Sequence, residues 1–238
     1  MDADGGGVIP RTEKLLRKMF AFPKVDSISV RDSYEKVQKL IDDPAKLNET
    51  FDAAINCSRF YPASPQQNID FGIGCISSES SMKDVLEIIQ NISRKGYKWK
   101  LFTNGNINDY NAARKILTEL GLSDNIDAYL FERPTRPAEL IQHITSFRYI
   151  ISFRLHSLII ASSFGIPSAG IVWDNKIIEF YKKIGFENRC YFSGRAEEID
   201  YEDICDIRKK EMLKEGVSKW MQVSTDMLLE QCKMNKKQ

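Results

Sequence analysis

The sequence predicts an α/β fold in which helices cover both faces of a parallel sheet. Short, nearly continuous apolar runs alternate with amphipathic helical patterns from about residue 69 to residue 195. Strands that are buried on both faces have this apolar character, and the helices between them supply the crossovers that parallel strands need. Glycine or asparagine closes several of these segments, as is typical at the ends of strands and helices.

The first elements of this pattern are strand 71–76 and helix 82–93. The strand is apolar throughout, and the helix carries Val85, Leu86, Ile88 and Ile89 near helical spacing. Strand 99–103 follows and ends at Asn104-Gly105, and helix 109–120 stops at Gly121. A short apolar run then predicts strand 128–131 and Pro137 opens helix 137–145.

The second half repeats the pattern. Strand 149–152 leads into helix 157–164, and Gly165-Ile166-Pro167 turns into strand 168–173. Helix 176–184 is closed by Gly185, and strand 190–192 precedes the terminal helices. This strict alternation predicts a Rossmann-like domain, in which ligands bind outside the carboxyl ends of the strands.

The first 68 residues give a weaker pattern. A strand at 27–30 precedes a helix at 33–41, and the segment 42–68 cannot be assigned. Residues 53–57 fit either a strand or a helical turn. Gly5-Gly6-Gly7 has no strand before it, so it does not form a phosphate-binding loop.

Composition narrows the function classes. A net charge of +1 over 238 residues, with no basic stripe, argues against nucleic-acid binding. No run reaches the roughly 18 apolar residues of a membrane span, and the segment 1–11 lacks the apolar core that is typical of a signal peptide. The five cysteines, Cys57, Cys75, Cys190, Cys205 and Cys232, lack metal-site spacing and indicate reduced thiols. We therefore expect a cytoplasmic protein without a bound metal.

The candidate site lies where the strand 149–152 meets the helix 157–164. Arg154 and His156 share this turn, and a helix N-terminus offers N–H groups and partial positive charge to a small anion. Asp174 and Lys176 follow the next strand in the same way. Because carboxyl ends of parallel strands meet at one edge, we expect these four side chains at the same edge.

Structural interpretations remain open for each of these residues. Arg154 fits equally well as the partner of a carboxylate at the rim of the sheet, and a lone histidine such as His156 is more often structural than catalytic. His143 lies inside a helix and is interpreted as structural. Asn104-Gly105 is better explained as a turn and helix cap than as a phosphate loop.

Two enzyme classes are excluded by their missing motifs. Gly72-x-Gly74 lies within a strand and lacks the third glycine of a dinucleotide-binding loop. No Gly-x-Ser-x-Gly elbow surrounds Ser157 or the Ser162-Ser163 pair, which removes the serine-hydrolase interpretation.

Several of these segments together resemble the polysaccharide pyruvyl transferase family. The match is clearest from about Leu130 to Tyr191 and includes the Arg-Leu-His-Ser step at 154–157, Gly165-Ile166-Pro167 and Asp174-x-Lys176. Upstream, the segment 29–33 (Ser-Val-Arg-Asp-Ser) is similar to the Val-Arg-Asp-x-x-Ser segment of the family, although no second serine follows at 35 or 36.

The resemblance implies a reaction and a set of roles. Family members transfer the enolpyruvyl group of phosphoenolpyruvate to two hydroxyls of a sugar, forming a pyruvate ketal in cell-surface or exopolysaccharide synthesis. Carried over by motif, His156 is the acid–base group and Arg31 and Arg154 hold the donor. The other implied substrate contacts are Leu155, Ser157, Asp174 and Lys176. Arginine forks match both the phosphate and the carboxylate of such a donor, and no cofactor is implied.

The resemblance also implies a domain organisation. Family members have a fold similar to the two-domain GT-B glycosyltransferases, and only thirty residues precede Arg31 here. We therefore expect an N-terminal stub and linker at 1–68, a donor-binding Rossmann-like domain at 69–195 like the C-terminal half of a GT-B fold, and C-terminal helices at 196–238. A homo-oligomer or a partner chain would then supply the missing half.

Two other functions stay open at this point. A GT-B glycosyltransferase would place the phosphates of a nucleotide sugar at the same Arg-x-His turn. A truncated, non-catalytic domain would bind its donor without turnover.

Overall fold

The computed structural model describes residues 10–63 and 66–235. The described residues divide into two compact units, one within 1–52 and 220–238 and the other within 53–219. These limits concern compactness alone. The functional division into 1–68, 69–195 and 196–238 stays a prediction, and Gly5-Gly6-Gly7 lies outside the described residues.

The first unit is built around two short parallel strands. Strand β1 (Ile28–Val30) pairs with β2 (Leu47–Glu49), and helices α1 (Pro10–Phe20) and α2 (Tyr34–Gln38) belong to the same unit. The ring of Phe51 packs on Trp220 with centroids 5.2 Å apart. The predicted strand at 27–30 is confirmed, the helix predicted at 33–41 is shorter than expected, and α1 was not predicted.

The second unit contains a five-stranded parallel sheet in the order β4-β3-β5-β6-β7. Its strands are β3 (Ile69–Gly74), β4 (Trp99–Phe102), β5 (Phe147–Ser152), β6 (Ser168–Val172) and β7 (Cys190–Phe192). Within this sheet, β3 is the first strand in the sequence. Strand β4 pairs with one side of β3 and β5 pairs with the other side, so the strand order reverses between β3 and β5.

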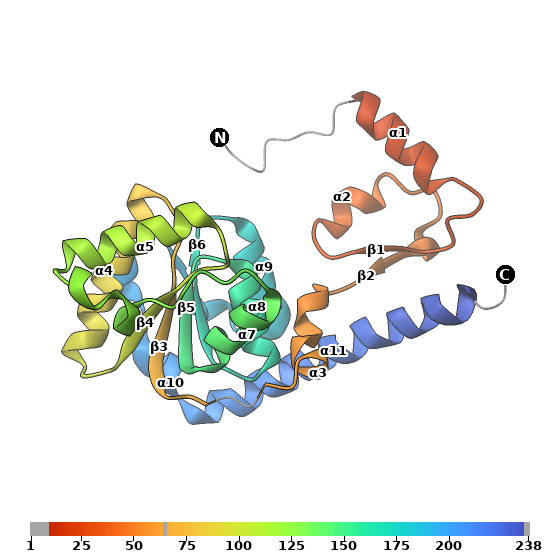
Figure 1. Cartoon of the computed structure of the whole chain (residues 1–238). Helices are drawn as coiled ribbons and strands as arrows, with labels where there is room; N and C mark the ends of the chain where they lie inside the picture. The colour runs from red at the N-terminus through yellow and green to blue at the C-terminus, as the bar shows by residue number, and fades with distance from the viewer. Residues whose placement is uncertain (1–9, 64–65, 236–238) are drawn as a thin grey trace. The chain divides into compact units, whose positions relative to one another are not determined.

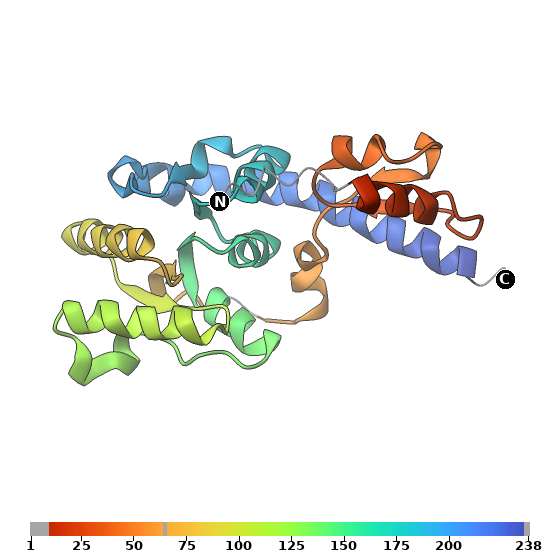
Figure 2. The same ribbon diagram turned by 90° about the horizontal axis from the view of Figure 1, so that it is seen from above.

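Helices lie between consecutive strands of the sheet (Figure 1). From residue 53 onward the helices are α3 (Cys57–Phe60), α4 (Glu79–Arg94), α5 (Ile107–Glu119), α6 (Ile126–Tyr129), α7 (Pro137–Thr145), α8 (Leu155–Ser163), α9 (Asn175–Ile184), α10 (Tyr201–Cys205) and α11 (Ile207–Asn235). Of these, α4, α5, α7, α8 and α9 correspond to the predicted helices 82–93, 109–120, 137–145, 157–164 and 176–184. The last element, α11, blue in Figures 1 and 2, is one unbroken helix.

Both faces of the sheet are covered. On one face, Ile73 and Ile151 of the sheet share a buried cluster with side chains of α4, α5 and α10. On the other, Gly170 of β6 lies against Leu158 of α8 and against α9. The α/β class and the parallel, doubly covered sheet are thereby confirmed.

The strand predicted at 128–131 is wrong. This stretch begins as the end of α6, and only Leu130 forms a single parallel bridge, with Leu101. The aromatic residues that suggested a strand are engaged elsewhere. Tyr129 packs on Trp99, and Phe131 stacks on His143 with centroids 4.3 Å apart.

The ambiguous residues 53–57 are helical. A 3₁₀ turn at Ala53–Asn56 runs directly into α3, which settles the choice between strand and helical turn. Over the described residues, none of the helices has the length and apolar character needed to cross a membrane.

Candidate functional site

The turn between β5 and α8 lies where the strand order of the sheet reverses. Arg154 is the N-cap residue of α8 and, having no side-chain acceptor, makes no side-chain cap. The Arg154 side chain therefore does not occupy the first N–H groups of α8. In open α/β sheets, ligands bind outside the carboxyl ends of the strands at such a reversal, and anions favour a helix N-terminus.

A buried carboxylate holds the Arg154 side chain. Asp109, in the first turn of α5, is fully buried, and its Oδ2 accepts from Arg154 Nε at 3.1 Å and from Nη2 at 2.6 Å. Its Oδ1 accepts from the Ser77 N–H at 3.0 Å, in the loop after β3. Asp109 thus ties the loop after β3 to the turn after β5.

Arg154 still reaches solvent. Its side chain is 31% exposed, and the bonds to Asp109 use only Nε and Nη2 of the guanidinium. The structural interpretation, an arginine paired with a carboxylate at the sheet rim, is therefore confirmed. The pairing also orients the guanidinium at the edge where a ligand would bind.

The other residues of this turn divide into exposed and buried ones. His156 is exposed at the second residue of α8, and Leu155 is half-buried at the first. Ser157 is fully buried, and its hydroxyl donates to Asn104 Oδ1 at 2.6 Å. Ser157 therefore fastens the loop after β4 to the start of α8.

Asp174 and Lys176 lie at the start of the next helix. Asp174 is the N-cap of α9 and accepts from the Lys176 N–H at 3.0 Å, and Lys176 Nζ lies 3.6 Å from Asp174 Oδ2. The Trp173 indole joins this strand end to the first one, because Nε1 donates to the Phe153 carbonyl oxygen at 2.6 Å. The two predicted strand ends therefore lie together.

Arg31 belongs to the first unit, not to the unit that holds the other predicted residues. It follows β1 and forms ion pairs with Asp32, at 2.7 Å, and with Asp52. Burial acts to lower the pKa of Arg31, but the hydrogen bonds to both carboxylates outweigh it and raise the pKa.

His143 has the structural role that the sequence predicted. It is half-buried on α7, and its ring stacks on Phe131 with planes 3° apart. Burial lowers the pKa of its imidazole.

The cysteines described near the sheet are unsuited to nucleophilic catalysis. Cys75, directly after β3, is buried, and burial followed by the charge of Asp109 raises its pKa. Burial likewise raises the pKa of Cys190 to about 12. A thiol with a raised pKa stays protonated near neutrality.

Sequence reasoning missed Asp109 and Trp173. An acidic residue in the first turn of a helix is commonly explained by the helix dipole, and nothing local to Asp109 indicates its burial. For Trp173, the sequence predicts only the end of the strand 168–173. The signal that both carry is position, since each lies within a few residues of a strand's carboxyl end.

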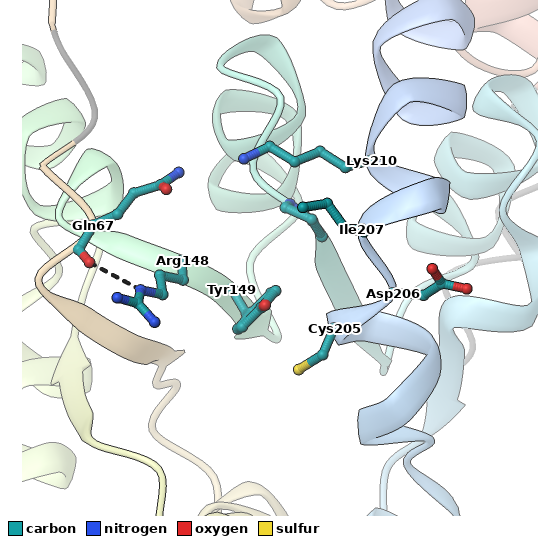
Figure 3. Close-up of a pocket in the computed structure, with 8 residues that line it drawn as sticks. Gln67, Arg148, Tyr149, Cys205, Asp206, Ile207 and Lys210 are labelled. Carbon is teal, nitrogen blue, oxygen red and sulfur yellow. Dashed lines mark hydrogen bonds between the residues drawn. The ribbon is translucent and has the colours of Figure 1, made fainter.

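A separate pocket of about 140 Å³ lies at the amino ends of β5 and β6, away from the Arg154 turn at their carboxyl ends (Figure 3). It is lined by Gln67, Arg148, Tyr149, Pro167, Cys205, Asp206, Ile207 and Lys210. Arg148 Nε donates to the Gln67 carbonyl oxygen at 3.2 Å, and Arg148 also pairs with Asp70. None of the predicted site residues lines this pocket.

Comparison with solved structures finds proteins of related fold. The chain superposes on a mutant O-GlcNAc transferase of Thermobaculum terrenum with a TM-score of 0.52 and 15% identity, covering 84% of this chain and 41% of that one. A second similar structure is the UDP-GlcNAc 2-epimerase of Methanocaldococcus jannaschii in complex with UDP-GlcNAc and UDP. Its TM-score is 0.46 at 11% identity, covering 76% of this chain and 49% of that chain. The chain thus spans less than half of either structure.

The first similarity confirms the expected Rossmann-like fold of the GT-B kind and, at this identity, concerns the fold alone. No curated protein matches the sequence. A family model described as polysaccharide pyruvyl transferase matches residues 6–175, which include Arg31 and the whole turn from Arg154 to Ser157. This chain therefore belongs to the polysaccharide pyruvyl transferase family.

Proposed function

We propose that this protein is a pyruvyl transferase that moves the enolpyruvyl group of phosphoenolpyruvate onto sugar hydroxyls in cell-surface or exopolysaccharide synthesis. One observation carries the proposal beyond family membership. An arginine oriented by a buried carboxylate stands at the N-terminus of α8, two residues before an exposed histidine.

The donor suits this turn by charge and shape. Phosphoenolpyruvate carries about three negative charges in a small volume, and a guanidinium fork binds phosphate and carboxylate oxygens alike. Asp109 offsets part of the Arg154 charge, but it also holds the fork in place, so less side-chain entropy is lost on binding. The α8 N-terminus adds N–H donors and partial positive charge without a counterion of its own.

The reaction needs proton transfers that an imidazole can perform. Two acceptor oxygens bond to the central carbon of the enolpyruvyl group, and the bond from that carbon to the phosphate oxygen breaks. Of the two hydroxyl protons, one ends on the methylene carbon, which becomes a methyl group, and the other leaves with phosphate. We assign His156 as the acid–base group because it is exposed at this turn and because an imidazole can both accept and donate a proton.

The remaining predicted residues are assigned to substrate binding. Asp174 and Lys176 present a carboxylate and an ammonium at the neighbouring strand end, where they can bind sugar hydroxyls. Arg31 is assigned to the donor by its motif. No cofactor is required by the chemistry as written.

The proposal is tested by donor binding in wild type, Arg154→Lys and Arg195→Lys. Arg154→Lys keeps a cation beside Asp109 but loses the fork, and Arg195, exposed beside Glu198, is the matched control. A ligand at one hundred times its dissociation constant stabilises a fold by about 2.7 kcal/mol. We expect millimolar phosphoenolpyruvate to raise the melting temperature of wild type and Arg195→Lys, and to raise that of Arg154→Lys far less.

Turnover is followed as acceptor-dependent phosphate release, with His156→Asn as the inactive variant that still binds donor. Stabilisation by UDP-GlcNAc without stabilisation by phosphoenolpyruvate would reject the proposal in favour of glycosyl transfer. Donor binding without phosphate release at any protein concentration would instead indicate a donor-binding domain without turnover. Release that appears only at high concentration would indicate a homo-oligomer.

A further inference from the structure

Trp173 combines a fixed orientation with an exposed ring. It directly follows β6, and its indole N–H donates at 2.6 Å to the carbonyl oxygen of Phe153, the residue before Arg154. The residue nevertheless remains 55% exposed. One edge of the indole is thus attached to the Arg154 turn while much of the ring surface faces water.

This arrangement differs from an ordinary exposed apolar residue. Single exposed apolar side chains are common and need no special explanation. Trp173, however, is held by a hydrogen bond, and it lies at the carboxyl edge of the sheet, where ligands of such sheets bind. When the N–H of a tryptophan is engaged, its π-face remains available for stacking.

The groups around the ring match the surface of a sugar. A pyranose has an apolar face of C–H groups and a rim of hydroxyls, so it stacks on an aromatic ring while its hydroxyls bond to polar side chains. Asp174 and Lys176, the next residues of the turn, offer an acceptor and a donor of hydrogen bonds. His156, on the turn that Trp173 contacts through Phe153, is the group that would exchange protons with a hydroxyl.

We propose that Trp173 is the stacking platform for the pyranose ring of the acceptor and places its hydroxyls beside the Arg154–His156 turn. This inference rests on the proposed function, since it takes the acceptor to be a sugar. Trp173 thereby selects acceptors that have an apolar pyranose face. Asp174 and Lys176 select among these acceptors by the pattern of their hydroxyl groups.

The experiment tests separately what the aromatic face of Trp173 and its indole N–H contribute to sugar binding. Binding of methyl β-D-galactopyranoside and methyl α-D-mannopyranoside, without donor, is measured by saturation-transfer-difference NMR titration. Trp173→Phe keeps an aromatic face but loses the N–H, and Trp173→Leu keeps apolar bulk but loses the face. Phe60→Leu is the matched control, because Phe60 is 72% exposed on α3, which bonds through the Ser58 N–H to Ser163 at the far end of α8.

We expect Trp173→Leu to weaken binding of at least one glycoside about tenfold, given the usual worth of aromatic contacts. Trp173→Phe should weaken it no more than about threefold, and Phe60→Leu should leave it unchanged. In all variants phosphoenolpyruvate should still raise the melting temperature, so loss of acceptor binding is distinguished from loss of the donor site.

Three results would overturn the inference. Equal losses in Trp173→Phe and Trp173→Leu would mean that the bond to Phe153 matters and the ring face does not. Binding of neither glycoside by the wild type would show that the ring is no sugar platform. Trp173-dependent binding of uridine monophosphate in place of the glycosides would assign the ring to a nucleobase. A failure of phosphoenolpyruvate to bind, with glycoside binding intact, would instead count against the proposed function alone.

Discussion

Asp109 shows how one side chain organises the strand ends of this sheet. Its carboxylate is fully buried and accepts from the Ser77 N–H and from two nitrogens of Arg154. A buried carboxylate needs such partners, because desolvation of an unpaired charge is costly. The same contacts orient Arg154, so stability and site geometry depend on one residue.

Arg154→Ala should therefore destabilise the second unit by about 3 kcal/mol, because it leaves the Asp109 carboxylate buried without its cation. Removing Asp109 as well should recover part of this loss, so Arg154→Ala/Asp109→Ala should cost less than the sum of the single variants. Urea unfolding measures these differences. Arg195→Ala, which breaks an exposed pair with Glu198, should cost less than about 1 kcal/mol. Strict additivity in the double variant would contradict the pairing.

His143 is a single residue that should make the stability of the fold depend on pH. Burial lowers its pKa, Lys100 lowers it further and Glu139 opposes them, so the folded state binds the proton less readily than the unfolded state. The Nδ1 atom is buried without a hydrogen-bond partner among the described residues. Charging this ring would place a cation against the Phe131 stack.

The direction in which stability changes with pH follows from the difference in proton binding between the folded and unfolded states. As the pH falls below the ordinary histidine value of about 6.5, the unfolded state takes up the proton first, so stability decreases on acidification. His143→Gln should reduce the loss of unfolding free energy between pH 7.5 and pH 5.5. His156→Gln is the comparison variant in the same urea titrations. An unchanged pH dependence in His143→Gln would show that His143 is not the titrating group.

Among the elements, β3 depends on its two glycines. Gly72 and Gly74, which do not form a dinucleotide-binding loop, allow close packing between β3 and β5. A Cβ on Gly72 would lie 2.3 Å from the ring of Phe147, and one on Gly74 would lie 2.3 Å from Ser152 Oγ. Phe147 and Ser152 are fully buried, so neither can move aside into solvent.

Gly72→Ala should consequently cost about 1–3 kcal/mol of unfolding free energy, the usual range for overpacking a tight core. Phe147→Leu shortens the side chain that meets the added methyl group. The double variant Gly72→Ala/Phe147→Leu should thus be more stable than the sum of the two single losses predicts. Chemical denaturation of the wild type, both single variants and the double variant measures these free energies. If the loss in the double variant equals the sum of the two single losses, the two side chains do not collide.

Helix and strand positions were mostly predictable, and the exceptions have a physical cause. Strand 190–192 and helix 137–145 coincide with β7 and α7, because apolar periodicity and an initial proline are local signals. The stretch 128–131 has the composition of a strand, yet it lies beside β4 with only one bridge. There, Tyr129 and Phe131 pack on Trp99 and His143 instead of extending the ladder.

Across the whole chain, the two compact units were not predictable from the sequence. The sequence placed boundaries by composition, whereas the units are defined by contacts between distant segments, with part of α11 in each. A helix continuous in sequence carries no local mark of the point where its packing partners change. Arg31 was grouped with the Arg154 turn by motif, although the two residues belong to different units.

The sequence by itself determined the α/β class, the order of most strands and helices, the family, and the strand-to-helix turn that carries Arg154 and His156. These features depend on periodicity and on residues close together in the chain. Only the tertiary structure decided that Asp109 binds Arg154 across 45 residues and that Trp173 bonds to Phe153 across 20. Such pairings depend on which strand ends the fold brings together, and on burial that no local pattern records.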